Sequence, residues 1–345
     1  MAAHFTNPLT PPNGGGWSRD RQNAILTAAM GLPRNPNTFA NNPLHRASQK
    51  RTDDEWLKAC LSDPSTRILP LWQLKPFVRN VDGAEDRREI GWWAPADMGD
   101  LMSDDGLCVL LGEMDKRVYF ALDVPGGADL GEAAPFKGNG TFAKLRDVAA
   151  GLQPGEAAIL AQAKSMIDWH ARHKFCANCG QETTPGAAGY KRICAACGVE
   201  HFPRTDPVVI TLVVKDDMCL LGRSAGFPGN MYSCLAGFIE PGESIEEAVV
   251  REINEEVGVN VTCIRYHSTQ PWPYPSSLMI GCIAEALDDT VCVDGVEIES
   301  AKWILRADVC KLINGEYCDD IRLPSPMAIA HQLIRSWALE EDDAS

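Results

Sequence analysis

Hydrophobic and polar positions alternate along the second half of the chain in a way that predicts a sheet. Apolar runs at residues 207–214 and 218–221 flank the acidic turn 215–217, so we expect two strands joined by a tight turn. Further short apolar runs predict strands at residues 261–267, 278–284 and 301–305.

Three other segments show helical spacing. Within residues 244–257 the apolar residues recur every three or four positions, at Ile245, Ala248, Val249 and Ile253. The same spacing predicts a helix at 155–173 and an amphipathic helix at 327–339. Because helices alternate with strands, we expect an α/β fold in which a mixed sheet lies between helices.

Composition divides the chain into regions. Residues 1–50 include stretches rich in Pro, Asn and Gly that cannot bury much apolar surface, so we expect a poorly ordered leader. Apolar runs within residues 51–150, with strands at 107–111 and 118–124, predict an N-terminal α/β domain. The remaining predicted regions are a linking helix at 151–173, a cysteine-rich segment at 174–203 and a C-terminal α/β domain at 204–340.

Charge constrains the partners. The 345 residues are 45% hydrophobic and carry a formal net charge of -15. This charge opposes nonspecific attraction to nucleic acid or anionic membranes, so an anionic substrate has to be met by local arginines, lysines or bound metal. The N-terminal residues lack a basic segment followed by an apolar core, and no run approaches ~18 apolar residues, so neither secretion nor a membrane span is expected.

Four of the 13 cysteines form one pattern, and the other nine are scattered through apolar contexts. Such a scattered set suits a reducing compartment, so we expect a cytoplasmic protein. A peroxisomal location is the alternative, although residues 343–345 do not match a Ser-Lys-Leu ending.

The patterned cysteines are two Cys-x2-Cys knuckles, Cys176 with Cys179 and Cys194 with Cys197. Two such knuckles complete the tetrahedron that Zn²⁺ favours, and four thiolates leave no position for substrate, which predicts a structural zinc site. A disulfide pair is disfavoured by the compartment, and a nucleic-acid-binding ribbon is not supported by the acidity. The nearby His170, His173 and His201 are not assigned as ligands: the first two are expected to be features of the helix end, and spacing identifies no partner for the third.

The helix predicted at 244–257 carries three carboxylates within one turn, those of Glu252, Glu255 and Glu256. Like charges at this spacing repel, and a divalent cation would neutralise them. The alternative is a solvated acidic face. Arg251 is offset by about 100° from Glu252 along the helix, so a salt bridge to Glu243 or to another carboxylate of this region is expected in preference to a substrate contact.

Residues 270–277, Gln-Pro-Trp-Pro-Tyr-Pro-Ser-Ser, combine three alternating prolines with two aromatic rings. The prolines stiffen the backbone, and rigid rings can stack on planar bases. Taken alone, the segment is typical of a proline-rich loop.

These features occur in an order that resembles a known family. The fixed positions of the Nudix box, Gly-x5-Glu-x7-Arg-Glu-aliphatic-x-Glu-Glu-x-Gly-aliphatic, are matched by Gly237, Glu243, Arg251, Glu252, Ile253, Glu255, Glu256, Gly258 and Val259. With the cysteine knuckles before it and Gln-Pro-Trp-Pro-Tyr-Pro-x-Ser after it, the chain resembles the NADH pyrophosphatase branch of the Nudix hydrolases, whose members hydrolyse NAD(H) and in some cases remove NAD caps from RNA. The resemblance implies a Nudix α/β/α sandwich with a mixed sheet, preceded by a zinc ribbon and by a degenerate Nudix-like α/β domain.

The resemblance also implies roles for individual residues. Mg²⁺ or Mn²⁺ would be bound by Glu252, Glu255, Glu256, the carbonyl of Ala236 and Glu297, with Glu256 as the first choice of general base. Zn²⁺ would be bound by Cys176, Cys179, Cys194 and Cys197. Substrate would be contacted by Phe202, Phe238, Arg146, Ala330 and the specificity loop Gln270, Pro271, Trp272, Pro273, Tyr274, Pro275, Ser276 and Ser277. Phe202 stands where some relatives have tyrosine, and members of the branch are commonly homodimers.

Two rival functions remain at this stage. One is a Nudix hydrolase of ADP-ribose or of dinucleoside polyphosphates, against which the loop around Trp272 argues. The other is a noncatalytic module in which the zinc ribbon binds a partner, although the three helical glutamates that a relict site would lose are all present. Sequence does not separate free NADH from an NAD-capped RNA 5′ end as the substrate, because both present the same reactive group.

Overall fold

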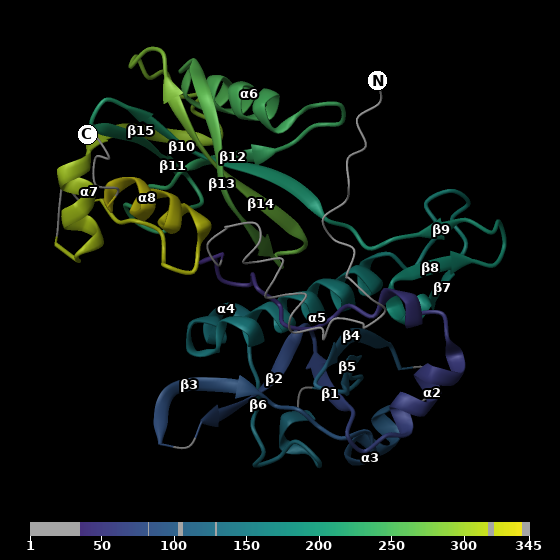
Figure 1. The fold of residues 1–345 in the computed structure, drawn as a ribbon. Coiled ribbons are helices and arrows are strands. Elements are labelled where there is room, and N and C mark those ends of the chain that lie inside the picture. Colours follow the sequence, from purple (N-terminus) through teal and green to yellow (C-terminus); the bar gives the residue numbers. More distant parts are fainter. Residues whose placement is uncertain (1–34, 82, 103–105, 128–129, 317–320, 340–345) are drawn as a thin grey trace, which may run out of the picture. The chain divides into compact units, whose positions relative to one another are not determined.

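The computed structural model describes residues 35–81, 83–102, 106–127, 130–316 and 321–339. From Asn37 onward the chain forms one compact unit. In the described residues this unit contains two six-stranded sheets and one three-stranded sheet (Figure 1). The predicted mixed α/β architecture is confirmed.

The N-terminal sheet has the strand order β3-β2-β1-β5-β4, with β6 paired to β2. Strand β1 is parallel to β5 and antiparallel to β2. The strands predicted at 107–111 and 118–124 are confirmed as β4 and β5. The bounds of the strands are β1 Arg67–Trp72, β2 Lys75–Val81, β3 Ala84–Ile90, β4 Cys108–Met114, β5 Arg117–Asp123 and β6 Thr141–Phe142.

Short helices precede, connect and follow the strands of this sheet along the chain. They are η1 Ser48–Lys50, α2 Asp54–Ser62, α3 Pro95–Met98, η2 Gly99–Met102, η3 Leu130–Glu132, α4 Leu145–Val148 and η4 Ala149–Gly151. The long helix α5, Pro154–Arg172, buries Ile159, Ala163 and Ile167, as its apolar stripe predicts. It packs on β2, β4 and β5 and also touches a strand of the C-terminal sheet, β13, Val261–Trp272.

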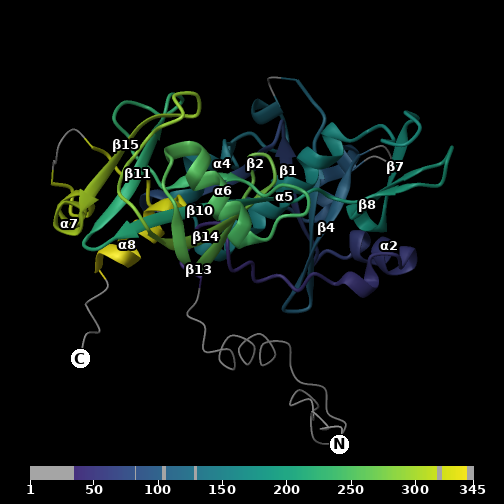
Figure 2. The same ribbon diagram turned by 90° about the horizontal axis from the view of Figure 1, so that it is seen from above.

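The small sheet follows α5 directly. Its strands are β7 Thr183–Gly186, β8 Lys191–Cys194 and β9 Glu200–His201, with the one-turn helix η5, Ala187–Gly189, between the first two. In the view from above, β1 and β4 lie between the C-terminal sheet and the strands β7 and β8 (Figure 2).

The C-terminal sheet has the order β13-β14-β10-β11-β15, with β12 paired to β10. Strand β10 is parallel to β14 and antiparallel to β11 and β12. All five strands predicted here are confirmed, and β13 continues well past the predicted end. The bounds not yet given are β10 Asp206–Lys215, β11 Met218–Ser224, β12 Leu235–Phe238, β14 Ser277–Ala286, β15 Ile298–Leu305, α6 Ile245–Val257, α7 Arg306–Ile313 and α8 Ile329–Leu339.

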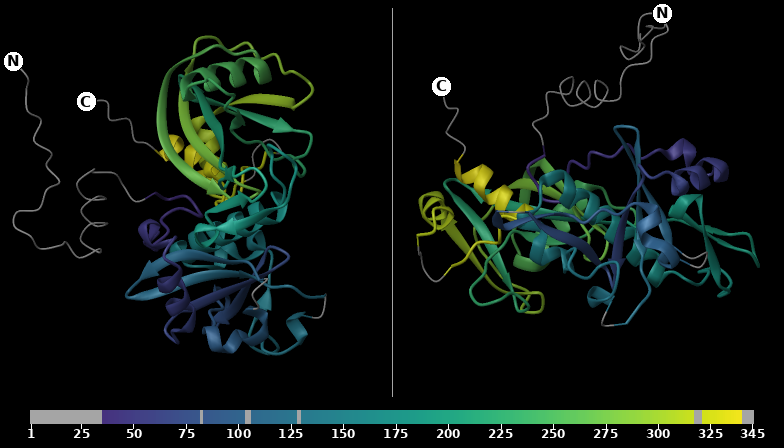
Figure 3. Two further views of the ribbon diagram at one scale, coloured as in Figure 1. Left: turned by 90° about the vertical axis from the view of Figure 1, so that its right-hand side faces the viewer. Right: turned by 90° about the horizontal axis from the view of Figure 1, so that it is seen from below.

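Helices cover both faces of this sheet because successive side chains of a strand point to opposite sides. Val209 and Val213 of β10 pack in a core with the apolar face of α6. Ile210 and Leu212 of the same strand pack in a second core with α8. Figure 3 shows the green helix α6 and the yellow helix α8 on opposite sides of the strands. Among the described helices, each is too short or too polar to cross a membrane.

The prediction of a poorly ordered leader is wrong for residues 37–50. Phe39, Leu44 and Ala47 are buried in the cores of the N-terminal half, and Asn37 is only 3% exposed. Composition suggested disorder because the segment is rich in Pro and Asn, but its few apolar residues are all placed in contact with distant elements. Residues 1–34 lie outside the described residues.

Candidate active site

Helix α6 is fixed at both ends by local interactions. Ser244 Oγ accepts a hydrogen bond from the Glu247 N–H at 3.2 Å, and Glu247 Oε2 accepts one from the Ser244 N–H at 2.7 Å, which forms a capping box. The helix ends at Gly258, whose φ of 71° is left-handed. With Ala248, Val249 and Ile253 buried, Glu252 and Glu256 are held on the side of the helix that faces β12.

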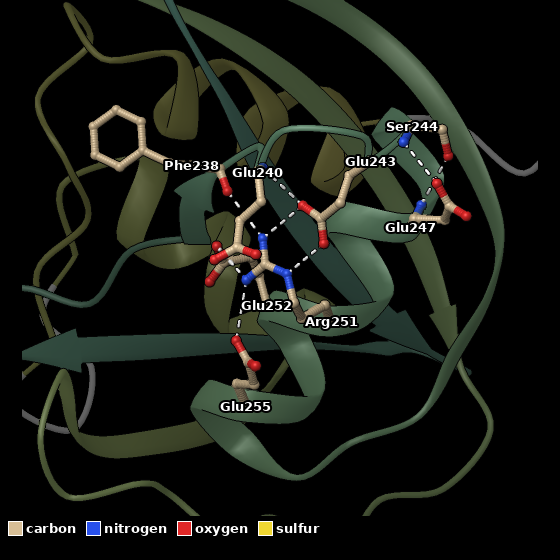
Figure 4. A network of polar contacts seen from close by, with 8 residues as sticks. All are labelled: Phe238, Glu240, Glu243, Ser244, Glu247, Arg251, Glu252 and Glu255. Atoms are coloured by element: carbon tan, nitrogen blue, oxygen red, sulfur yellow. Dashed lines mark hydrogen bonds and ion pairs between the residues drawn. The ribbon is translucent and has the colours of Figure 1, made fainter.

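Arg251 connects the carboxylates along this helix (Figure 4). Its Nε and Nη2 donate to the two oxygens of Glu243 at 2.5 and 2.8 Å. Its Nη1 lies 2.9 Å from Glu252 Oε1 and 3.0 Å from Glu255 Oε2. The hydrogen bonds from Arg251 lower the pKa of Glu243 to about 2. The expectation that Arg251 pairs with Glu243 and with other carboxylates of the box is confirmed.

Glu256 is the most buried carboxylate of the group, at 5% exposed. Burial raises its pKa to about 8, and repulsion from Glu252, Glu297 and Asp294 adds to the shift. A hydrogen bond from the backbone of Ala236 opposes it, but Glu256 Oε2 has no hydrogen-bond partner among the described residues. A buried carboxylate oxygen without a donor is costly unless a cation or a proton occupies the position beside it. The donor set therefore fits a divalent metal ion.

Strand β12 approaches α6 so closely that a side chain at one position would displace a carboxylate of the helix. A Cβ atom on Gly237 would lie 1.9 Å from the carboxyl carbon of Glu252. Burial also raises the pKa of Glu252, against the attraction of Arg251. Ala236 and Gly237 thus place the β12 backbone directly beside Glu256 and Glu252.

Glu297 enters from outside the helix. It lies in a turn in which Asp294 accepts hydrogen bonds from the N–H groups of Glu297 and Ile298, both at 2.9 Å. Its side chain is exposed, and its charge raises the pKa of both Glu252 and Glu256. Of the predicted metal ligands, Glu252, Glu256 and Glu297 therefore lie near enough for their charges to interact, and the Ala236 backbone is hydrogen-bonded to Glu256. Glu255 is exposed and turned toward Arg251.

The four knuckle cysteines close around one point. Their sulfur atoms all lie within 4.8 Å of one another, with Cys176 and Cys197 3.6 Å apart and Cys179 and Cys194 3.5 Å apart. A tetrahedron with Zn–S of ~2.3 Å requires about 3.8 Å between sulfurs, so the cluster fits zinc. In each knuckle the glycine after the second cysteine has positive φ, Gly180 at 77° and Gly198 at 75°.

The histidines near this cluster have other roles. His170 is 2% exposed, with Nε2 2.8 Å from the Gly189 carbonyl and Nδ1 3.0 Å from Arg192 Nη1. Burial lowers its pKa to about 4. His170 therefore joins α5 to the small sheet as a neutral ring. Sequence reasoning missed that His201 Nε2 lies 3.2 Å from Cys176 Sγ, although its position just after the second knuckle is a possible signal.

The predicted substrate residues are placed in different surroundings. Phe202 and Phe238 expose 64% and 60% of their surface, which leaves both rings accessible. Gln270 is 1% exposed, and its amide is occupied by the carbonyls of Thr38 and Met327 and by the N–H of Ile329. Ala330 is 2% exposed within the core under α8. The side chains of Gln270 and Ala330 are therefore buried and contribute packing and hydrogen bonds inside the protein.

The proline-aromatic segment is a β-hairpin rather than a free loop. Pro271 and Trp272 end β13, and Ser277 begins β14 opposite Trp272. Within the turn, Pro273 is buried, Pro275 is exposed and Ser276 Oγ lies 3.2 Å from Asp206 Oδ2.

The two rings of the hairpin contact cations. Arg146 Cζ lies 4.7 Å from the Tyr274 ring centroid and 5.8 Å from that of Trp272. Lys164 Nζ lies 4.8 Å from the Tyr274 ring and donates to the Pro273 carbonyl at 2.6 Å. A cavity of ≈ 420 Å³ beside Tyr274 is lined by these two cations together with Lys75 and Lys144. Arg146, which the family resemblance suggested as a substrate contact, therefore lies against the two rings of the predicted specificity loop.

Comparison with known proteins assigns all three folded parts. The NUDIX domain model matches residues 204–320, the NADH pyrophosphatase-like rudimentary NUDIX domain matches residues 65–169, and the NADH pyrophosphatase zinc ribbon domain matches residues 171–202. The four-cysteine cluster lies in this last segment, which supports a structural zinc.

Curated relatives match much of this chain. The chain is 38% identical over 337 residues to NAD-capped RNA hydrolase NUDT12 of Macaca fascicularis, covering 87% of this chain and 73% of the relative. It is 32% identical over 358 residues to the NAD-capped RNA hydrolase of Schizosaccharomyces pombe, covering 90% and 95%. It is 38% identical over 217 residues to the mitochondrial NAD(P)H pyrophosphatase NUDT13 of Homo sapiens, covering 60% and 62%. The chain therefore belongs to the Nudix hydrolase family, in the branch that joins a NADH pyrophosphatase-like rudimentary domain and a zinc ribbon to the catalytic domain.

Proposed function

We propose that this protein hydrolyses the pyrophosphate bond of NAD(H) to give AMP and nicotinamide mononucleotide, and that it also removes NAD caps from RNA. The observation that supports this most is the buried, partnerless oxygen of Glu256 beside Glu252, under a strand whose glycine leaves room for both. Such a site is built to hold a cation against a diphosphate. The relatives that match this chain are named for NAD-capped RNA and NAD(P)H hydrolysis.

The residue roles follow from the geometry. Glu252, Glu256, Glu297 and the Ala236 carbonyl would hold Mg²⁺ or Mn²⁺, with Glu255 as an outer ligand that first has to leave Arg251. A divalent ion supplies charge neutralisation at the phosphates and activates water. Glu256 would accept the proton of the attacking water, and its raised pKa would be lowered beside a bound cation, which would keep it ionised. Arg251 holds Glu252 through the ion pairs described above.

Substrate recognition is assigned to exposed groups. Phe202 and Phe238 provide two accessible rings for a planar base, and Arg146 places a positive charge beside the hairpin at Trp272 and Tyr274. Zinc has a structural role, because all four of its positions are filled by cysteine. We further propose a homodimer in the cytoplasm; the described cysteines are all free thiols, which suits a reducing compartment.

Product analysis tests this function. NADH, NAD⁺, ADP-ribose and an NAD-capped oligonucleotide would be incubated separately with the protein and Mg²⁺ or Mn²⁺. We expect AMP with reduced nicotinamide mononucleotide from NADH, AMP with nicotinamide mononucleotide from NAD⁺, and a 5′-monophosphate RNA from the capped oligonucleotide. Release of AMP from ADP-ribose but not from NADH would reassign the substrate. No hydrolysis of any of the four would favour a binding module instead.

A further inference from the structure

A short segment before the N-terminal domain reaches the hairpin that contains Trp272 and Tyr274. We call residues 37–42 the strap. Asn37 Nδ2 donates to Ser268 Oγ and to the Thr269 carbonyl, both at 2.9 Å. The Thr38 carbonyl accepts from Gln270 Nε2 at 2.9 Å. The strap is therefore bonded to three consecutive residues of β13, immediately before the proline-aromatic turn.

Phe39 is the apolar contact between the strap and the hairpin. It is 2% exposed, and its ring centroid lies 6.0 Å from Trp272 and 6.4 Å from Tyr274, in both cases edge to face. Trp272 and Tyr274 also contact each other at 5.3 Å. Such pairs fix the relative orientation of rings more strictly than aliphatic contacts do.

The backbone at Phe39 is held in an unfavourable conformation. Its φ of 71° is left-handed, which is uncommon for a residue with a large side chain. The turn is closed by a hydrogen bond from the Ala40 N–H to the Asn37 carbonyl at 3.2 Å. The surrounding contacts thus maintain a costly conformation that inserts the Phe39 ring against the hairpin.

The far end of the strap is tied to α5. Asn42 Nδ2 donates to the Ala158 carbonyl at 3.3 Å and to Gln162 Oε1 at 2.9 Å. Lys164 of the same helix binds the Pro273 carbonyl in the hairpin. The hairpin is therefore held by both the strap and α5, which are also bonded to each other.

We propose that the strap positions the Trp272–Tyr274 hairpin for substrate, with Phe39 as a specificity-determining positioning residue. The inference rests on the proposed function in one respect, namely that the hairpin contacts a nicotinamide dinucleotide. A shift of about 1 Å in a positioning group can reduce turnover by up to about 100-fold, so loss of the Phe39 ring should be measurable far from the metal site.

The test compares Phe39→Leu with Phe136→Leu in the full-length protein. Both residues are buried phenylalanines of the N-terminal half, but the described ring contacts of Phe136 are with Phe77, Trp93 and Phe142, away from the hairpin. For Phe39→Leu we expect the KM for NADH to rise about tenfold. The metal concentration that gives half-maximal rate should stay within about twofold, because the carboxylates are untouched. Equal changes in both variants, or none in Phe39→Leu, would overturn the proposal.

A second measurement keeps the proposal testable if NADH is not the substrate. Hydrogen–deuterium exchange without ligand should be faster for backbone amides of residues 270–279 in Phe39→Leu than in the wild type, and unchanged there in Phe136→Leu. Inactive wild-type protein with this exchange pattern would overturn the proposed function but support the strap. Active wild-type protein with unchanged exchange in Phe39→Leu would do the reverse.

Discussion

The five strands on the main path of each six-stranded sheet pair in the same pattern, but the segments between the strands differ. Read as β3-β2-β1-β5-β4 and β15-β11-β10-β14-β13, each has a middle strand that is parallel to one neighbour and antiparallel to the other. Between β3 and β4 the described residues form the four-residue helix α3 and a short 3-10 turn. Before β13 it forms the thirteen-residue helix α6 with its glutamates. The two sheets therefore share a framework, and the candidate metal-binding glutamates lie on helix α6, which has no counterpart of similar length before β4 among the described residues.

The cores differ in the same sense. In the N-terminal half, Phe77, Trp93, Phe136 and Phe142 pack with ring centroids 4.9 to 5.7 Å apart. In the C-terminal half, β12 and α6 instead approach over Gly237 and bury Glu256. The aromatic core of the N-terminal half stabilises the fold, whereas the C-terminal half buries the carboxyl group of Glu256, which costs folding free energy.

The largest effect on turnover is expected at the buried carboxylate. Glu256→Gln keeps the size of the side chain but removes its charge and basicity, so kcat should fall by a factor on the order of 10²–10³. The matched change in the N-terminal half is Asp97→Asn in α3, whose carboxylate accepts a hydrogen bond from the Ala94 N–H. Steady-state rates with NADH should show no loss for this control. Comparable losses in both variants would remove the functional distinction between the halves.

A smaller loss is expected from Gly237→Ala. The added methyl would overlap the Glu252 carboxyl group, which has to move away from the metal position, and a displacement of this size costs roughly 10-fold to 100-fold in kcat/KM. Gly226→Ala is the control, because a Cβ atom there meets nothing within 4 Å. Metal titrations of the rate should show weakened metal dependence only for Gly237→Ala. Wild-type metal dependence in that variant would contradict the close approach of β12 to Glu252.

The metal-free protein should lose stability as pH rises. Glu256 has a pKa raised to about 8, against ~4.3 in an unfolded chain, so the folded state binds the extra proton between these values. Stability from this group is complete below about pH 4 and is lost as pH rises through about 8. In EDTA the Tm of the wild type should therefore fall relative to Glu256→Gln between about pH 4.5 and 8 and level off above about pH 8, by about 3 °C per kcal/mol lost. Mn²⁺ should reverse the difference; parallel Tm curves for the two proteins in EDTA would contradict a buried titrating Glu256.

The smallest effect on turnover is expected from the aromatic core of the N-terminal half. Phe136→Ala removes a 0% exposed ring and should lower the free energy of unfolding by about 3–5 kcal/mol. Denaturant titration measures that loss, and kcat per folded molecule should stay within about twofold of the wild type. A large fall in kcat at temperatures where the variant is folded would mean that this half contributes directly to catalysis.

Local spacing was enough to predict the parts of the site that lie on one element. The Nudix box placed α6, its three glutamates and the Arg251–Glu243 pair, because helix geometry fixes those distances. The knuckle cysteines were equally readable, since two short turns determine the sulfur positions.

Contacts between remote segments could not be read in the same way. Asn37 donates a hydrogen bond to Ser268, which is 231 residues away in the sequence, and no repeat of residue types along the chain predicts such a pair. For the same reason the sequence predicted Gln270 as a substrate contact, whereas its amide joins Thr38, Met327 and Ile329. The leader was misjudged because its composition is that of a flexible chain, although Phe39 and Leu44 are buried. Helix α7 and strand β12 were not predicted, as both are short and lack a clear repeat.

The hydrogen bonds of Gln270 have a consequence for protein engineering. The recognisable catalytic segment is residues 204–320, but this one amide is satisfied by Thr38 before it and by residues 327 and 329 after it. A fragment cut to the recognisable segment would leave a buried amide without its partners, at a cost of about 1–3 kcal/mol for each lost group. Grafting this catalytic domain onto another protein would therefore require the strap to be carried with it, even though the two are separated by more than 150 residues of sequence.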